Sequence, residues 1–452
     1  MTDHKTLSQL SGELESGKLT ARALVDEALE RAQGSANQGD VAFISIDADT
    51  IRAEAESIDK ARAEGNAPSP YAGIPVSIKD LFDVKGQVTA AGSTILASNP
   101  PAAKDAEPVA RLRAAGFIPF GRANMTEFAF SGLGMNAHYG DPASPWQRGV
   151  GRVAGGSSSG GAVSVAEGIV PLTLGTDTGG SCRIPAACCG IVGYKPTAVR
   201  VPQDGTVELA TSLDSIGPLG NSVDCCARAF GVLAGGPPTA PEPRDVSSLR
   251  LGVLKNYVLE NMDQTVAAAY EAALDALAKA GATLEDVTFD PLDRMPEINA
   301  RGGLVTAEAL RFHKGRLAQH EAEFDQRVSK RIRRAETQEE GEYDRILLAR
   351  REMIDQAEQV FAGYDAIVMP TIPIVPPKFE DVASDDGYTR NNLLLLRNPS
   401  VGNWLDRCAI SLPVTPDLSA PVGFMLMGVP GNDEALFACA FAAEQAFAPL
   451  RT

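Results

Sequence analysis

The stretch GGSSSGGAVSVAEGIVPLTLGTDTGGSCRIP, residues 155–185, is the part of the chain whose backbone is most constrained. Residues 151–195 contain 11 of the 43 glycines, far more than an even spread over 452 residues would place there. Glycine costs conformational entropy on folding unless a tight turn or a close approach requires it. Between the glycine clusters, residues 162–166 favour a helix and residues 169–174 a buried strand. The stretch therefore predicts two loops with a tightly constrained backbone, joined by a helix and a strand.

The first loop, GGSSSGG at residues 155–161, taken alone is also typical of a flexible linker. Apolar, structured sequence follows it closely and the composition does not change across it, which disfavours a linker. The phosphate-binding pattern requires Lys and then Ser or Thr after the last glycine, where this chain has Ala162 and Val163. The GxGxxG dinucleotide pattern is also absent. We interpret the segment as a loop that exposes hydroxyl and backbone N–H groups.

The second loop, GTDTGGSCRIP at residues 175–185, presents Ser181 behind two glycines. Consecutive small residues can direct backbone N–H groups at one point, as an oxyanion hole requires. A serine hydroxyl is a weak nucleophile and requires a base within hydrogen-bond distance. The four histidines do not lie in a GxSxG or other triad setting, which disfavours a Ser-His-Asp triad. A lysine base is the alternative.

The segment GIPVSIKD, residues 73–80, supplies a candidate lysine. Aliphatic residues at 74, 76 and 78 alternate with non-aliphatic ones at 75, 77 and 79, which predicts a strand with Lys79 at its end. Lysine has a pKa near 10.4 in water, so a lysine that acts as a base near neutral pH must be buried. The end of a buried strand meets that condition, although a solvated surface charge is the commoner state of a single lysine.

Three segments together, GIPVSIKD (73–80), AGGSSSGG (154–161) and LGTDTGGSCRIPAACCGIVGYKPT (174–197), closely resemble the amidase signature family. The 24 residues that separate Ser157 from Ser181 agree with that family. The similarity continues through residues 195–197 and 212–218, and resumes faintly from Pro370 and Ala409 onward. Cys182 departs from the family, which usually has an aliphatic residue there. Residues 240–400 are where the family varies and where substrate choice is largely set.

The resemblance implies a Ser–cis-Ser–Lys triad. Ser181 would be the nucleophile that forms an acyl-enzyme, Lys79 the base acting at one remove, and Ser157 the relay between them. A cis peptide bond is expected at Gly156–Ser157.

The resemblance also implies the groups around the triad. The backbone N–H groups of Thr178, Gly179, Gly180 and Ser181 would form the oxyanion hole. Asp177 and Arg183 would brace the loop as supporting residues, with a purely structural ion pair as the alternative. In the loop at residues 129–135, Phe130 and Ser131 are candidate substrate-binding residues, with ordinary packing as the alternative.

The predicted function is hydrolysis of a carboxylic amide C–N bond. The same acyl transfer admits aryl amides, esters and carbamates, so a urethanase is also compatible. The alternative is the amidase-like subunit of a tRNA-dependent amidotransferase. A catalytically silent scaffold is disfavoured, because all three triad positions hold competent residues. No metal or organic cofactor is implied, since the chain itself supplies the base and the oxyanion donors.

Composition restricts the partners. Acidic residues outnumber basic ones 58 to 41, for a net charge of −17, which repels polyanions and anionic membranes on average. The chain has neither a signal-peptide core nor an uncharged apolar stretch of membrane-spanning length, so the cytoplasm is the expected compartment. The expected partner is a small amide or carbamate, with no direct nucleic acid and no membrane, and both a monomer and a homodimer fit. The seven cysteines are predicted to be small buried hydrophobes.

The strands and helices that alternate along the chain predict an α/β fold. The resemblance implies the amidase signature fold, a large mixed central β-sheet flanked by helices, as a single domain over residues 1–452. Within it we expect N-terminal helices packing on the core (1–65) and the signature core itself (66–235). A variable helical region on the substrate side (240–365) would follow, and then strands and a helix that return to the core (366–452).

Overall fold

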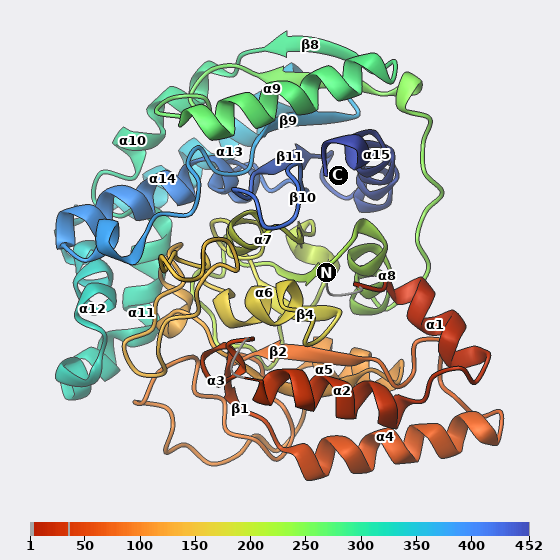
Figure 1. Cartoon of the computed structure of the whole chain (residues 1–452). Coiled ribbons are helices and arrows are strands. Elements are labelled where there is room, and N and C mark those ends of the chain that lie inside the picture. The colour runs from red at the N-terminus through yellow and green to blue at the C-terminus, as the bar shows by residue number, and fades with distance from the viewer. Residues whose placement is uncertain (1–3, 35–36, 452) are drawn as a thin grey trace.

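Eleven strands form one mixed β-sheet around which the chain is built (Figure 1). The structure, a computed structural model, describes residues 4–34 and 37–451. In order across the sheet the strands are β1 (Phe43–Ser45), β3 (Ile118–Ala123), β2 (Pro75–Lys79), β4 (Leu172–Thr176), β6 (Ile216–Gly220), β5 (Val192–Lys195), β10 (Ala409–Pro413), β11 (Gly423–Met427), β9 (Ala366–Pro370), β7 (Arg250–Leu254) and β8 (Thr283–Val287).

The direction of the strands changes across the sheet. The strand β2 runs parallel to both of its neighbours, β3 and β4. From β4 to β9 every neighbouring pair is antiparallel, and β9, β7 and β8 are again parallel. Because β2 and β4 are parallel and Ile78 pairs with Leu174, the carboxyl ends of these two strands meet at one edge of the sheet.

Helices cover both faces of the sheet (Figure 1). The longer ones are α1 (Leu7–Glu15), α2 (Ala21–Gln33), α4 (Ala48–Ala63), α5 (Glu107–Ala114), α6 (Ser159–Ala166), α7 (Arg183–Cys189), α8 (Val223–Leu233), α9 (Gln264–Lys279), α11 (Gly303–His320), α12 (Gln326–Arg333), α13 (Glu342–Val360), α14 (Asp385–Trp404) and α15 (Asp433–Phe447), and α3 (Gly39–Ala42) and α10 (Met295–Ile298) are single turns. Asp263 caps α9, since its side chain accepts a hydrogen bond from the backbone N–H of Val266.

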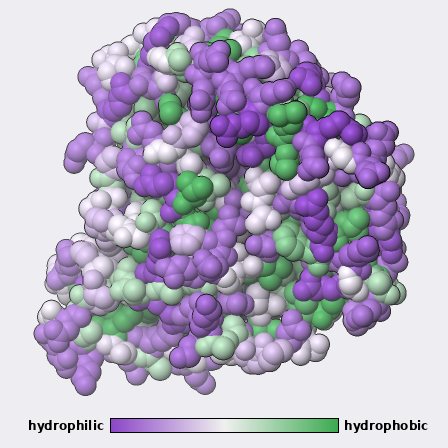
Figure 2. All heavy atoms as spheres, turned by 180° about the vertical axis from the view of Figure 1, so that it is seen from behind, coloured by the Kyte–Doolittle hydropathy of each residue, from purple (hydrophilic) through white to green (hydrophobic). Residues whose placement is uncertain are grey.

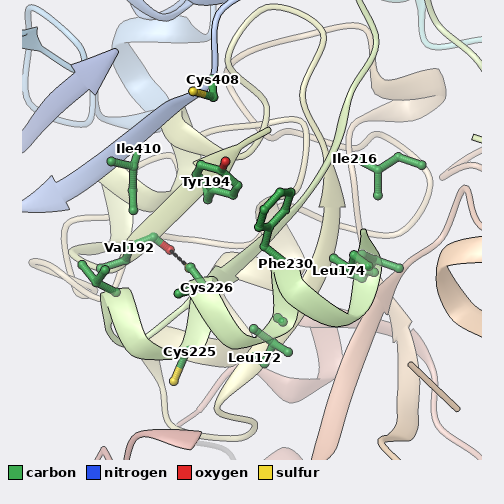
Figure 3. Close-up of a cluster of buried hydrophobic side chains, with 14 of the residues drawn as sticks. Leu172, Leu174, Val192, Tyr194, Ile216, Cys225, Cys226, Phe230, Cys408 and Ile410 are labelled. Atoms are coloured by element: carbon green, nitrogen blue, oxygen red, sulfur yellow. Dashed lines mark hydrogen bonds between the residues drawn. The ribbon is translucent and has the colours of Figure 1, made fainter. Parts of the chain in front are cut away.

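The core is divided between the faces of the sheet. One buried cluster joins side chains of α1, α5, α8, α9 and α15 to the sheet, and a second joins those of α2, α4, α6 and α7. Along β6, Ile216 belongs to the first cluster and Leu219 to the second, as the alternation of a strand requires. Figure 3 shows the first cluster around Tyr194 and Phe230, with Cys225 and Cys226 among the aliphatic side chains. All seven cysteines are buried and free, which confirms their prediction as small hydrophobes.

Two expectations need correction. Residues 1–65 contain the edge strand β1 in addition to helices, and residues 240–365, expected to be helical, contribute β7 and β8 to the far side of the sheet. The strand at residues 75–79 is present and all five of its residues are buried, as expected for a buried strand that ends at Lys79. A strand with parallel partners on both sides and helices on both faces has no solvent face.

The face in Figure 2 is mostly hydrophilic, with apolar side chains in small scattered groups, as is normal for a folded domain. Over the described residues, no helix combines the length and the apolar character needed to cross a membrane.

Candidate active site

Lys79 ends β2 inside the molecule, with 1% of its surface exposed. Its Nζ donates to Ser157 Oγ and to Thr176 Oγ1, both at 2.8 Å. Thr176 ends β4, so the parallel pairing of β2 with β4 brings the two side chains together. Burial disfavours the charged form and lowers the pKa of Lys79 to about 8. The structure therefore joins the predicted base to the predicted relay serine.

Ser157 lies in the first glycine loop, two residues before the start of α6, and is fully buried. The peptide bond Gly156–Ser157 is cis, as predicted. The backbone of this loop is held from two sides, since Gly156 N–H donates to Gly132 O at 2.8 Å and Ser157 O accepts from Thr126 N–H at 3.1 Å. A Cβ on Gly156 would lie 2.6 Å from Gly134 N, so no larger residue fits.

Ser181 lies on the turn between β4 and α7, with 4% of its surface exposed, and borders the large cavity described below. In the described part of the chain, no hydrogen bond joins the Ser157 and Ser181 hydroxyls. The lysine–serine half of the predicted relay is thus formed, and the step from Ser157 to Ser181 stays a prediction.

The carboxylate of Asp177 organises the second glycine loop, residues 175–185, which is called the nucleophile loop below because it carries the predicted nucleophile Ser181. It accepts hydrogen bonds from Arg183 Nη2 at 2.8 Å and Nε at 3.0 Å, from Cys182 N–H at 3.1 Å and from Asn403 Nδ2 at 2.9 Å. Burial alone would raise the pKa of Asp177, but the charge and hydrogen bonds of Arg183 outweigh it, and the pKa falls to about 2. The predicted pair is formed, and its contacts with the loop backbone favour a bracing role.

Asn403 is a part of the site that sequence reasoning missed. It comes from α14 and also donates to the carbonyl of Asp177 at 3.0 Å. It is 226 residues from its partner, and no local motif marks it.

One predicted oxyanion donor is corrected. The N–H of Gly180 donates to Asp177 Oδ1 at 2.8 Å, so the loop itself uses it. Within the described residues, the N–H groups of Thr178, Gly179 and Ser181 have no acceptor. Three of the four predicted donors are therefore free.

Asp214 supports the same loop from the segment before β6. Its Oδ1 accepts from Thr178 Oγ1 at 2.5 Å, and its Oδ2 accepts from the N–H groups of Leu209 and Ala210, both at 3.0 Å. Burial raises the pKa of Asp214 to about 6. The family resemblance includes residues 212–218, but the sequence analysis assigned no role to Asp214.

Cys182 directly follows the proposed nucleophile. It is fully buried, and burial raises the pKa of its thiol. Thiols react with oxidants mainly as thiolates, so the burial and the raised pKa of Cys182 both disfavour its oxidation.

A cavity of about 910 Å³ opens beside Ser181, Thr178 and Gly179. The predicted residues Phe130 and Ser131 both line it. Ser131 Oγ donates to Asn392 Oδ1 of α14 at 3.0 Å, which holds the loop against the opposite wall. Within residues 4–34 and 37–451, no group of three or more His, Cys, Asp and Glu side chains is arranged to hold a metal ion.

A family model described as Amidase matches residues 23–437. The chain belongs to the amidase family. The 2-amino-5-chloromuconic acid deaminase of Comamonas testosteroni is 36% identical over 449 residues, which cover 98% of this chain and 96% of that protein. A glutamyl-tRNA(Gln) amidotransferase subunit of Anaeromyxobacter sp. (strain K) is 34% identical, covering 96% of this chain and 94% of that protein.

A crystal structure of an amidase matches this amidase-family chain with a TM-score of 0.87 at 32% identity, covering 98% of this chain and 99% of that one. The family resemblance and the α/β fold with a large mixed sheet are thereby confirmed. As a member of the amidase family, the chain is a hydrolase of carbon–nitrogen bonds.

Proposed function

We propose that the chain is a stand-alone amidase that works through an acyl-enzyme on Ser181. The observation that carries the proposal is the buried contact of Lys79 with Ser157 at 2.8 Å, on the edge of the sheet from which the nucleophile loop also begins. A buried lysine that touches a buried serine has no evident structural purpose that an apolar pair would not serve better.

In the proposed mechanism, the proton of the Ser181 hydroxyl is transferred by way of the contact between Ser157 and Lys79. When Ser181 Oγ attacks the carbonyl carbon of the substrate, Ser157 Oγ accepts its proton and passes its own to the neutral amine of Lys79. The second bond, from Lys79 to Thr176, occupies one N–H, so the nitrogen lone pair can face Ser157. The same path in reverse protonates the leaving amine, and water then repeats the sequence to release the acid.

The free N–H groups of Thr178, Gly179 and Ser181 support the tetrahedral intermediate. They are the donors that the loop leaves unused, and they border the cavity in which a carbonyl oxygen would lie. Fixed donors of this kind stabilise an oxyanion without reorganisation during the reaction. The bonds of Asp177 to Arg183 and Asn403 hold the loop in that geometry.

The proposed substrate is a small carboxylic amide. The cavity is large enough for an acyl group and an amine together, and the same chemistry extends to aryl amides, esters and carbamates. Carbamate and ester cleavage are therefore part of the proposal as side activities.

A second candidate, the amidase-like subunit of a tRNA-dependent amidotransferase, is favoured by the 34% identity to a glutamyl-tRNA(Gln) amidotransferase subunit. It predicts L-glutamine as the only good substrate and a partner protein required for full activity. A stand-alone amidase predicts turnover of other amides by the isolated chain.

The test is release of ammonia or amine from aliphatic amides, anilides, aryl carbamates and L-glutamine, with Ser181→Ala as the matched control. We expect turnover of non-glutamine amides by the wild type and none by Ser181→Ala. Mass spectrometry of protein treated with an alkyl fluorophosphonate should place the adduct on Ser181. Undiminished turnover by Ser181→Ala would remove the nucleophile assignment, and turnover of glutamine alone would favour the amidotransferase.

A further inference from the structure

The charge of the cavity is opposite to the charge of the protein. The chain has 58 acidic and 41 basic residues. Among the charged residues that line the cavity, six are basic and three acidic: Arg327, Lys330, Arg331, Arg334, Arg390 and Arg397 against Glu260, Asp293 and Asp385. Six basic and three acidic side chains give this lining a net charge of +3. A cavity with an excess of one sign of charge concentrates ligands of the other sign, which here are anions.

Most of these cations come from α12 and the residue after it, in the group of helices beside the sheet (Figure 1). The helix is basic on both sides, but its two sides differ in their partners. Arg333 does not line the cavity and forms ion pairs with Glu321 and Glu336. Arg331 lines the cavity. Arg333 therefore provides a matched control for substitutions of Arg331 on the same helix.

Four of the six cations form no ion pair with a carboxylate among the described residues. Arg327 and Lys330 share Asp385. Over the described residues, no carboxylate oxygen lies within 4.0 Å of the guanidinium nitrogens of Arg331, Arg334, Arg390 and Arg397. Arg334 and Arg390 are exposed to solvent, whereas Arg331 and Arg397 are partly buried. A partly buried guanidinium group without a carboxylate partner favours a ligand that supplies the counter-charge.

Arg331 contacts the loop that packs beside the proposed catalytic groups. Its Nη1 donates to Phe130 O at 2.6 Å, and its guanidinium carbon lies 4.5 Å from the centre of the Phe130 ring. The residues that follow Phe130 carry the backbone against which Gly156 packs, directly before Ser157. A guanidinium has five N–H donors, and one such bond leaves most of them for a ligand.

The guanidinium group of Arg331 is partly removed from water. Burial lowers the pKa of the guanidinium, and the nearby positive charge of Arg334 lowers it further. An anion bound there would meet a cation that is partly removed from water, where charge-assisted hydrogen bonds are strong. A planar guanidinium matches a carboxylate in two parallel bonds.

We propose that the substrate of this enzyme carries a carboxylate in addition to its scissile amide, and that Arg331 binds it, with Arg334 and Arg397 adding to the positive field. The proposal rests on the proposed function, because it assumes that the reaction occurs at Ser181. It makes Arg331 a specificity-determining residue and narrows the substrate class to amides of anionic molecules.

The test compares straight-chain dicarboxylates with monocarboxylates of equal length, from succinate and butanoate to suberate and octanoate, as protectors of Ser181 against a small neutral fluorophosphonate. In the wild type, the best dicarboxylate should protect at about tenfold or more lower concentration than its monocarboxylate, because a charge-assisted hydrogen bond adds about that much affinity. Arg331→Gln should abolish this ratio and Arg331→Lys should keep part of it. Arg333→Gln, on the outer side of the same helix, should keep all of it.

Each other outcome overturns a distinct claim. Equal protection by both ligand series in the wild type would refute the anionic substrate. An undiminished ratio in Arg331→Gln would refute the role of Arg331, whereas a purely structural role would change the labelling rate without changing the ratio. Failure of the fluorophosphonate to modify Ser181 in any sample would instead overturn the proposed function, and the inference with it.

Discussion

Replacing Lys79 with methionine should change stability and activity in opposite directions at neutral pH. The pKa of Lys79 falls from its ordinary value of 10.5 to about 8 because the side chain is buried. Below pH 8 the protonated lysine therefore costs about 3 kcal/mol of folding free energy. Methionine has a similar length and no charge, but it loses the hydrogen bonds to Ser157 and Thr176, worth about 1 kcal/mol each. Lys79→Met should thus be about 1 kcal/mol more stable than the wild type at pH 7.5.

The difference in stability between Lys79→Met and the wild type should depend on pH. The unfolded chain holds the lysine proton more tightly than the folded chain does. The free energy of unfolding of the wild type is therefore lowest below pH 8, rises between pH 8 and 10.5, and reaches its full value above pH 10.5. The advantage of Lys79→Met should shrink by about 2 kcal/mol from pH 7.5 to 9.5 and so change sign. Urea denaturation at several pH values, with the exposed Lys104→Met as the control, measures this difference. A difference independent of pH would refute the linkage.

Activity provides the other half of this prediction. Removal of a general base lowers the rate by about 10²- to 10⁴-fold, so Lys79→Met should be nearly inactive although it is folded. The kcat/KM of the wild type should rise as the pH increases through about 8, where the amine becomes neutral. A flat profile between pH 7 and 9 would contradict a lysine base.

The remaining predictions concern the nucleophile loop. Asp177→Asn should destabilise the fold by about 3–5 kcal/mol, because it leaves Arg183 buried without a counter-charge, and urea denaturation showing a loss below about 1 kcal/mol would contradict this. Gly180→Ala should not fold normally, since Gly180 has a φ of +126° and a Cβ there would lie 2.6 Å from Pro399 Cβ, whereas the nearest atom to a Cβ on Gly179 is 3.5 Å away. Gly179→Ala should therefore keep its melting temperature within a few degrees, and equal loss in both variants would show that the loop rejects any side chain.

Much of the fold near the site is predictable because its elements are coded locally. The alternation of residues 73–80 indicates β2, and the apolar runs of the tail indicate β9, β10 and β11. The edge strands were missed for a physical reason. Strand β8, at residues 283–287, carries Glu285 and Asp286 and has only Val287 buried, so it lacks a hydrophobic pattern and depends on pairing with β7.

The sequence by itself determined the chemical groups of the proposed site: the motifs place Lys79, Ser157 and Ser181, and the glycines of the two loops restrict the backbone to the turns that present them. The tertiary structure alone decided which groups surround them. Asn403 and Arg331 reach the site from 226 and 201 residues away, and Gly180 N–H is used by Asp177 instead of facing the cavity. Motifs and periodicity describe a residue and its near neighbours, whereas contacts of this kind depend on how separate helices pack on one sheet, which no local pattern encodes.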